Sequence, residues 1–220
     1  MIDVAGIGKS GKSRIDYNFH SLAKDVKAVI DKKHLKKCVL LGHAMGGIVA
    51  LETAIILKKQ ILGLIIAESL SPLSDYYARK VPEKEISQIM KDYEGNYQNY
   101  YDNLLRKMFG NKVSSELVEW YISVAGYGQF DSKILRKMVR NMLLYDYHDY
   151  IDLVSCPIKY IIQGLYSPEY LAIITREQKN ARIMKNIGHL VNVEDPEKFN
   201  QIVDEYMQEL VKIKNQQILE

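Results

Sequence analysis

Apolar residues fall in short runs along this chain, and segments with helical spacing separate each run from the next. The runs Cys38–Leu41 and Ile61–Ala67 are continuous, which is typical of strands buried on both faces of a parallel sheet. Cys156–Ile162 also has a strand pattern, and Ala181–Lys185 is a shorter, weaker strand. Strands that alternate with helices predict an α/β fold with a mostly parallel sheet flanked by helices.

Two helices are predicted from apolar residues that recur every three or four positions. The apolar positions of the first helix are Leu22, Val26, Val29 and Ile30. The last helix begins at Asp195-Pro196, because proline suits the first turn. Its predicted buried stripe is Phe199, Ile202, Val203, Tyr206, Met207 and Leu210. At the start of the chain, Met1–Val4 predicts the end of a further strand.

The chain changes character between about residues 71 and 150, where it is rich in tyrosine and largely helical in pattern. We expect residues 71–150 to form a helical lid, inserted into a core made of residues 1–70 and 151–220. Tyrosines of this lid are candidates to line a substrate pocket between lid and core, although such residues more often only pack a lid. They are Tyr97, Tyr100, Tyr101, Tyr121 and Tyr127.

The length of 220 residues suits one domain with an inserted subdomain. Thirty basic and twenty-seven acidic residues are interleaved to a net charge of +3, so no nucleic-acid partner is expected. The longest apolar runs fall short of a membrane span, so no membrane partner is expected either. We expect Cys38 and Cys156 to be small buried thiols in a reducing, cytoplasmic setting.

The segment Gly42-His43-Ala44-Met45-Gly46-Gly47 lies between a predicted strand and a helical pattern that begins at Ile48. A strand, a Gly-x-Ser-x-Gly turn and a helix make a nucleophile elbow, in which the glycines allow a sharp turn that raises the central side chain above the sheet. Here the central residue is Ala44, and its methyl group cannot attack a carbonyl carbon.

Four segments, in order, resemble the landmarks of the α/β-hydrolase superfamily. They are the glycine-rich loop Asp3–Ser10, the elbow Gly42–Gly47, the strand Cys156–Gly164 and the histidine loop Gly188–Pro196. The likeness spans almost the whole chain and is closest to lidded esterases and C–C hydrolases of small acyl substrates. It implies acyl transfer without a metal or cofactor, in which a serine attacks a carbonyl, a histidine moves its proton and an acid orients the histidine.

The resemblance also implies roles for individual residues. Ala44 occupies the nucleophile position, and His189 matches the general base and acid. The backbone N–H of Met45 would donate one hydrogen bond to the oxyanion. His43 would pack beside the nucleophile position as structural support at the substrate pocket.

The sequence offers several candidates for the acid of this implied triad. The usual acid position holds Ser167, which brings no charge to stabilise an imidazolium. Glu68 ends the second buried strand, where some lidded members, haloalkane dehalogenases among them, carry the acid instead. We favour Glu68 as the histidine's partner over Ser167, Glu169 and Asp195. The competing interpretation of Glu68 is a solvated glutamate at a strand end.

The resemblance does not include the first part of the family's pattern. The strands that normally precede the Asp3–Ser10 loop, one of which carries a His-Gly loop for half of the oxyanion hole, have no counterpart here. The strand at Ile2–Val4 and that at Cys38–Leu41 must therefore pair with each other, leave an exposed edge or borrow a strand from another chain. This predicts a truncated product, a fragment, or a protein whose sheet is completed by a partner or a second copy.

Two other functions stay open. The combined loss of the serine, the usual aspartate and the first strands favours a natural pseudoenzyme that binds a small molecule or a protein. The loop Gly6–Ser13 also meets the P-loop spacing Gly-x-x-x-x-Gly-Lys-Ser, which cradles nucleotide phosphates. A P-loop serine should lead straight into a helix, whereas Arg14–Phe19 intervenes here, so this interpretation is the weakest of the three.

Overall fold

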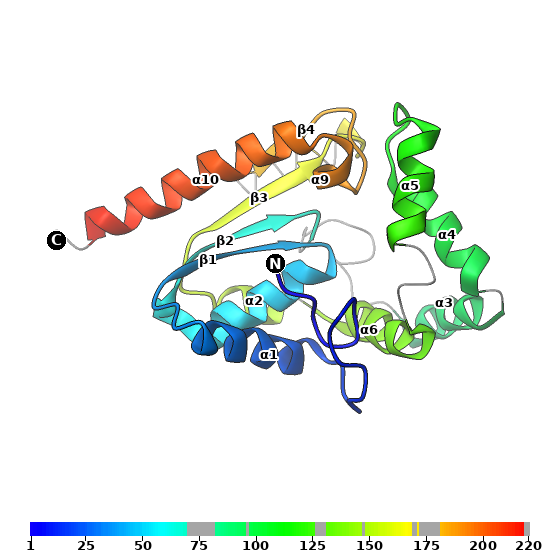
Figure 1. Ribbon diagram of the computed structural model, residues 1–220, viewed down its shortest axis with the longest axis horizontal. Helices are drawn as coiled ribbons and strands as arrows, with labels where there is room; N and C mark the ends of the chain where they lie inside the picture. The colour runs from blue at the N-terminus through cyan, green and yellow to red at the C-terminus, as the bar shows by residue number, and fades with distance from the viewer. Residues whose placement is uncertain are drawn as a thin grey trace.

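A parallel four-stranded sheet organises the chain, as seen in a computed structural model that describes residues 1–69, 82–95, 97–125, 131–146, 148–168, 171 and 181–217 (Figure 1). Its strands, in sheet order, are β1 (Cys38–His43), β2 (Ile61–Ala67), β3 (Ile158–Gln163) and β4 (Ala181–Met184). All three pairings are parallel. The predicted fold class, a mostly parallel sheet flanked by helices, is confirmed.

Helices cover both faces of the sheet. On one face lie α1 (Phe19–Lys32) and α2 (Met45–Leu57), the latter followed by a short 3-10 turn, and on the other lie α9 (Val191–Glu194) and α10 (Pro196–Gln217) (Figure 1). Successive side chains of a strand point to opposite faces. In β2, accordingly, Leu64 and Ile66 belong to the core cluster of α1 and α2, and Ile65 and Ala67 to that of α10. This explains why the β2 sequence is a continuous apolar run.

Both predicted amphipathic helices form, but in each of them one residue of the predicted buried stripe is exposed. In α1, Leu22, Val26 and Ile30 are buried, but Val29 is 38% exposed. In α10, the buried positions are Phe199, Ile202, Tyr206 and Leu210, and Val203 is half-buried. Met207 is 37% exposed, because one residue beyond Tyr206 the helix has turned by about 100° away from the sheet. The predicted stripes were therefore too wide.

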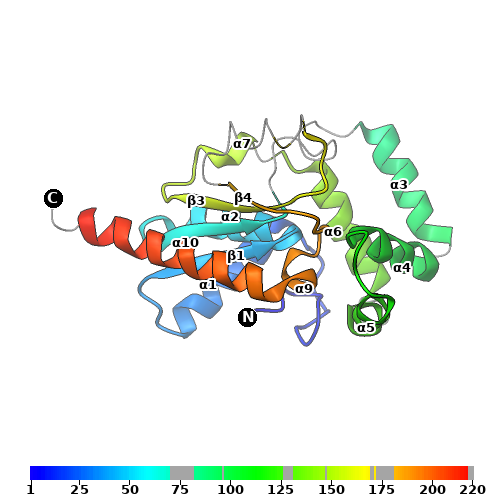
Figure 2. The ribbon, with the colours of Figure 1, turned by 90° about the horizontal axis from the view of Figure 1, so that it is seen from above.

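The segment between β2 and β3 consists, where it is described, of helices joined by turns and irregular connections, and no described part of it is a strand. It contains α3 (Glu83–Gly95), α4 (Tyr97–Met108), α5 (Ser115–Ala125), α6 (Ser132–Leu144) and the short α7 (His148–Ile151). Figures 1 and 2 show α3 to α6 beyond the carboxyl ends of the strands, the end at which open α/β sheets place their ligands. None of the helices within the described ranges is long and apolar enough to cross a membrane.

The strand end predicted at Met1–Val4 is wrong. These residues are irregular, and Asp3 instead anchors the following loop through its own carboxylate and carbonyl. Within the described residues, β1 pairs only with β2, so its second edge is open and Leu41 is 44% exposed. Met1–Val4 does not pair with this open edge or with any other described strand. Of the three arrangements expected for this region, the structure has the exposed edge.

Candidate functional site

The turn between β1 and α2 is sharp and strained. Ala44 stands between His43 and Met45 with φ 49° and ψ −127°, a conformation that costs a side-chain-bearing residue about 1–3 kcal/mol. A Cβ on Gly42 would lie 2.3 Å from the carbonyl oxygen of Gly46, so only glycine allows the helix to start this close to the strand. The Ala44 N–H donates to the Ala67 carbonyl at 3.0 Å, which ties the turn to the end of β2.

A cavity of about 300 Å³ lies in front of this turn. Ala44 and Met45 form one side of it, and Leu135 and Met138 of α6 form another. Tyr101 of α4 also lines it, so the helices beyond the strand ends contribute directly to the wall. A mostly apolar cavity of this size with a few polar groups is typical of a small-molecule site.

Glu68 and His189 meet beside the turn. Glu68 follows β2, its side chain is fully buried, and its Oε2 atom lies 3.1 Å from Nδ1 of His189. Gln163 donates to the same carboxylate through its backbone N–H at 2.6 Å and its side-chain amide at 2.9 Å. The Tyr166 hydroxyl donates at 3.1 Å. A carboxylate that accepts from Nδ1–H leaves Nε2 of the imidazole as its proton-accepting atom.

His43 links the turn to the histidine loop. Its Nε2 donates to the backbone carbonyl of His189 at 2.8 Å, and the two rings lie 4.9 Å apart, centroid to centroid. Burial, with a smaller contribution from the neighbouring His189, lowers the pKa of His43 to about 4. The His43 ring is therefore neutral at pH 7 and acts as a hydrogen-bond donor that fixes the backbone of His189 next to Ala44.

Glu194 joins the histidine loop to the connection between α4 and α5. Its carboxylate accepts hydrogen bonds from the N–H groups of Gly188, at 3.0 Å, and Gly110, at 3.0 and 3.1 Å. The N–H of His189 donates to the Met108 carbonyl at 2.7 Å. Burial raises the pKa of Glu194, and the two backbone donors oppose that effect. The loop that carries His189 is thus held by residues from the helical segment.

Sequence reasoning missed the residues that hold Glu68 and His189 in place. Gln163 carried a usable signal, because it ends β3 and β3 runs parallel to β2, with Ala67 opposite Ile161. Carboxyl ends of adjacent parallel strands meet at one edge, so polar residues there are neighbours. Tyr166 and Glu194 gave no comparable signal, since Tyr166 pairs with Glu68 and Glu194 with Gly110 across 98 and 84 residues of chain.

The other candidates for the acid role were Ser167, Asp195 and Glu169, and for the first two the structure shows other surroundings. Ser167 is exposed, and its carbonyl accepts from the Leu171 N–H at 2.9 Å. Asp195 caps α10 by accepting from the Lys198 N–H at 3.0 Å. Glu169 lies outside the described residues. Of the acids weighed from the sequence, the structure brings Glu68 to His189.

The predicted pocket tyrosines divide between different surroundings. Tyr101 lines the cavity, whereas Tyr100 packs against the cluster around Ile86. Tyr121 makes an edge-on contact with Phe109 at 5.5 Å between centroids, and burial raises the pKa of its hydroxyl. Tyr127 and the side chain of Tyr97 lie outside the described residues.

The Gly6–Ser13 loop lacks the context of a phosphate site. The N–H of Lys9 donates to the Asp3 carboxylate at 3.0 Å, so the loop already wraps an anion of its own. The next helix, α1, begins only at Phe19, well after Ser13. Over the described residues, no cluster of three or more histidine, cysteine or acidic side chains is placed to hold a metal ion.

Known proteins resemble this chain in sequence and in structure. A family model described as "alpha/beta hydrolase fold" matches residues 1–121. The AB hydrolase superfamily protein YisY of Bacillus subtilis (strain 168) is 28% identical over 144 residues, which are 60% of this chain. The pimeloyl-[acyl-carrier protein] methyl ester esterase of Wigglesworthia glossinidia brevipalpis is 25% identical over 199 residues, which are 85% of this chain.

These relatives are longer than the matched region. The match spans 53% of YisY, about half of its length, and 72% of the Wigglesworthia esterase. In structure, a thermophilic esterase from Thermogutta terrifontis superposes with a TM-score of 0.76 at 18% identity, over 94% of this chain and 78% of that one. At that identity the superposition establishes the fold alone.

Proposed function

The chain belongs to the α/β-hydrolase fold family, and we propose that its site is that of a serine esterase in which Ala44 has replaced the nucleophile. The substrate class proposed is a small molecule with an ester or similar acyl bond. The observation that carries the proposal is the Glu68–His189 pair, with 3.1 Å between Oε2 and Nδ1, fixed beside the strained turn at Ala44 by the His43 hydrogen bond.

With a serine at position 44, each group has a defined task. The serine Oγ would attack the acyl carbon as Nε2 of His189 takes its proton, and the imidazolium would later protonate the leaving group. The buried Glu68 carboxylate would orient the ring and stabilise its charge. Met45 begins α2, and an N–H in the first helical turn lacks an intrahelical acceptor, so it suits an oxyanion donor. One such donor typically contributes about 100- to 1,000-fold to turnover.

The side chain of Ala44 is a methyl group, which cannot form an acyl-enzyme. The alternative is therefore a pseudoenzyme that binds a small ligand without cleaving it. The observation in its favour is the cavity of about 300 Å³, which Ala44 lines together with residues of α4 and α6. Both functions place the ligand in the same cavity, and they differ only in whether the site can be reactivated.

We also propose that the helices between β2 and β3 act as a lid. Tyr101, Leu135 and Met138 lie in the cavity wall, so these helices would set which acyl group fits.

For the compartment we propose the reducing cytoplasm. Its support is the pair of free cysteines, of which Cys156 has a pKa raised to about 11 by burial and is therefore poorly reactive.

Reactivation of the site tests the proposal. The Ala44→Ser variant should hydrolyse p-nitrophenyl acetate and react with a fluorophosphonate probe, whereas the unmodified chain should do neither. Adding His189→Ala to Ala44→Ser should lower kcat by up to about 10⁶-fold, because the serine then has no base. A folded Ala44→Ser protein that neither turns over the ester nor takes up the probe would refute the esterase proposal and leave the binding function.

A further inference from the structure

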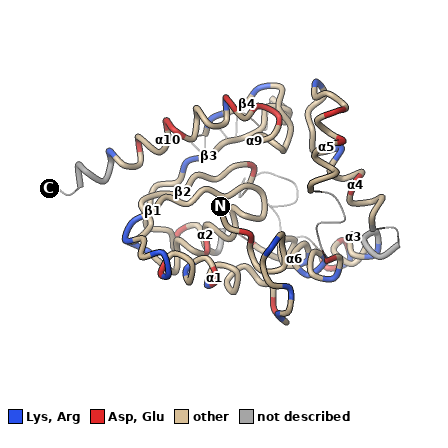
Figure 3. Tube along the Cα trace, viewed as in Figure 1, with Lys and Arg blue, Asp and Glu red and all other residues tan. Residues whose placement is uncertain are grey.

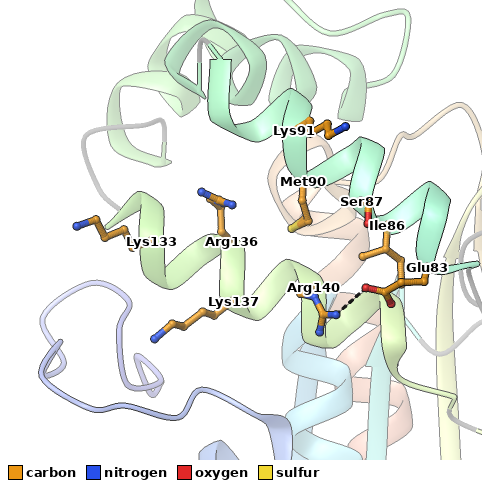
Figure 4. A pocket seen from close by; sticks show the side chains of 9 residues that line it. All are labelled: Glu83, Ile86, Ser87, Met90, Lys91, Lys133, Arg136, Lys137 and Arg140. Carbon is orange, nitrogen blue, oxygen red and sulfur yellow. Dashed lines mark hydrogen bonds and ion pairs between the residues drawn. The ribbon is translucent and has the colours of Figure 1, made fainter.

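The helices between β2 and β3 touch the rest of the chain in more than one place, and these contacts differ in what they reach. At α6, which carries basic residues at positions 133, 136, 137 and 140 (Figure 3), Lys137 donates to the Ile15 carbonyl at 3.3 Å on the surface. A cavity of about 670 Å³ lies between α6 and α3. Lys91 points away from Lys133 and Lys137 there (Figure 4), so these ammonium groups do not converge on one ligand position. The contact at the end of α4, in contrast, reaches His189.

That contact holds the backbone of His189. Met108 is the last residue of α4, and the carbonyls of a final helical turn have no donor within their own helix. The His189 N–H donates to the Met108 carbonyl at 2.7 Å. From the other side, Nε2 of His43 donates to the His189 carbonyl at 2.8 Å. Both backbone polar groups of His189 are therefore bonded, one to the helical segment and one to the residue before Ala44.

Glu194 joins the same two segments through its carboxylate. Its Oε1 atom accepts from the Gly188 N–H at 3.0 Å and from the Gly110 N–H at 3.1 Å. Its Oε2 atom lies 3.0 Å from the Gly110 nitrogen. Both glycines are buried, and a buried N–H needs an acceptor, so removal of this carboxylate would leave two N–H groups unsatisfied.

The two segments approach each other too closely to slide independently. A Cβ on Gly188 would lie 2.5 Å from both the Met108 oxygen and the Gly110 nitrogen. A Cβ on Gly110 would lie 2.7 Å from Oε2 of Glu194. Figures 1 and 2 show α9, which ends at Glu194, beside the α4–α5 region at the carboxyl end of the sheet. A displacement of the α4–α5 connection would therefore displace Gly188 and, with it, His189.

From these contacts we propose that Glu194 is a positioning residue, which keeps His189 beside residue 44 only while the α4–α5 connection is docked on the histidine loop. Because His189 is the proposed base, this role deepens the esterase function and rests on it. Tyr101, earlier on α4, lines the Ala44 cavity. One helix thus walls the cavity and holds the base, which couples the fit of the acyl group to the position of His189.

Hydrogen exchange in the unmodified chain tests this role without any need for activity. NMR of the isotope-labelled protein follows the His189 backbone N–H and its ring Nδ1–H, which faces Glu68. Glu194→Ala should exchange both about tenfold or more faster, because the loss of bonds to a charged carboxylate raises the population of the undocked loop. The matched control is Asp195→Ala, which removes the neighbouring carboxylate from the cap of α10 and should change both rates by less than about twofold.

Kinetics in the Ala44→Ser background separate positioning from a general loss of structure. Glu194→Ala should lower kcat by up to about 100-fold, because a base displaced by about 1 Å no longer meets the serine. Since Glu194 does not line the Ala44 cavity, KM should change by less than about threefold. Glu194→Gln keeps an oxygen in the place of Oε1 and should recover most of kcat, and Asp195→Ala should change neither constant.

Several outcomes would overturn this role. They are unchanged exchange at His189 in a folded Glu194→Ala protein, equal acceleration by Asp195→Ala, or a raised KM at constant kcat. If Ala44→Ser is itself inactive, the esterase function fails, and exchange of the His189 backbone N–H still decides what Glu194 holds. If Glu194→Ala does not fold, Glu194→Gln replaces it. Its amide would face the Gly110 N–H and should speed exchange by about threefold, and unchanged exchange there would refute the role.

Discussion

Two buried glutamates in this molecule each face Nδ1 of a histidine, at nearly the same distance. Glu68 Oε2 lies 3.1 Å from His189, and Glu52 Oε2 lies 3.2 Å from His20. Their carboxylates are equally well removed from water, with 0% and 6% of the side chain exposed. The histidines differ, because His189 is 21% exposed whereas His20 is 55% exposed. The pair itself is therefore not what distinguishes a reaction site.

The difference lies in what surrounds each pair. Glu68 ends β2 at the carboxyl edge of the sheet, where His189 is fixed next to the strained turn at Ala44. Glu52 lies within α2, and its pairing links that helix to the first turn of α1. A cavity does not separate the two pairs, since His20 and Glu52 line one of about 270 Å³ themselves. The feature that makes Glu68 and His189 the candidate catalytic pair is the strained turn at Ala44 beside them. Glu52 and His20 stabilise the packing of two helices.

The strongest way to break this comparison is to remove the charge of each glutamate in turn. In the Ala44→Ser background, Glu68→Gln should lower kcat by about 10²- to 10⁴-fold, because an amide cannot stabilise the imidazolium and favours the wrong imidazole tautomer. Glu52→Gln should leave kcat within about twofold. Initial rates with p-nitrophenyl acetate measure both effects.

Thermal melts of the two glutamine variants separate a loss of kcat from a loss of stability. Both substitutions place an amide where a buried carboxylate accepts several hydrogen bonds, so both should destabilise the fold. Equal losses of kcat in two folded variants would show that the two pairs do not differ in function.

The local sequence was enough to predict those parts of the fold and of the candidate site that depend on local burial. The strand β2 could be located because burial on both faces demands a continuous apolar run. The apolar run of β1 located that strand as well, although Leu41 in it is 44% exposed. Glu68 could be proposed as the partner of His189 because it ends one of those runs. The sharp turn could be placed because Gly42 leaves no room for a side chain against Gly46.

The rest depends on contacts between distant segments, and no local pattern encodes these. Glu194 and Gly110 are 84 residues apart, and only the docking of the α4–α5 connection on the histidine loop brings them together. The Met1–Val4 prediction failed for a related reason, since Asp3 bonds to Lys9 and Ser10 of the following loop and the segment does not pair with the open edge of β1. The pairing of Glu52 with His20 was equally invisible, because it requires the packing of α1 on α2.

Acid titration is a second way to separate the two histidine regions. The pKa of His43, which supports His189, is about 4 in the folded state against about 6.5 in an unfolded chain. Between these values the unfolded state binds more protons, so the free energy of unfolding falls as the pH drops from 6.5 towards 4, by up to about 3 kcal/mol. Urea unfolding at pH 7, 5.5 and 4 would measure this loss.

Matched variants assign that loss to one histidine. His43→Asn keeps a side-chain donor but removes the titrating ring, so its unfolding free energy should depend less on pH across this window. The matched control is His20→Gln, which replaces a histidine on α1 and leaves the His43 ring in place. An unchanged slope in His43→Asn would contradict the assignment.

The smallest expected effect gives the sharpest comparison, because each glutamate also accepts from a tyrosine at the same distance. Tyr166 donates to Glu68 and Tyr145 to Glu52, both at 3.1 Å. Tyr166→Phe and Tyr145→Phe each remove one hydrogen bond to a buried carboxylate and should each lower the free energy of unfolding by about 1–2 kcal/mol. In the Ala44→Ser background only Tyr166→Phe should also lower kcat, by about 3- to 10-fold, since only Glu68 orients the base. Urea unfolding and ester hydrolysis, measured on both variants, would then show similar stability losses but different activities; a similar loss of kcat in Tyr145→Phe would mean that stability alone controls the site.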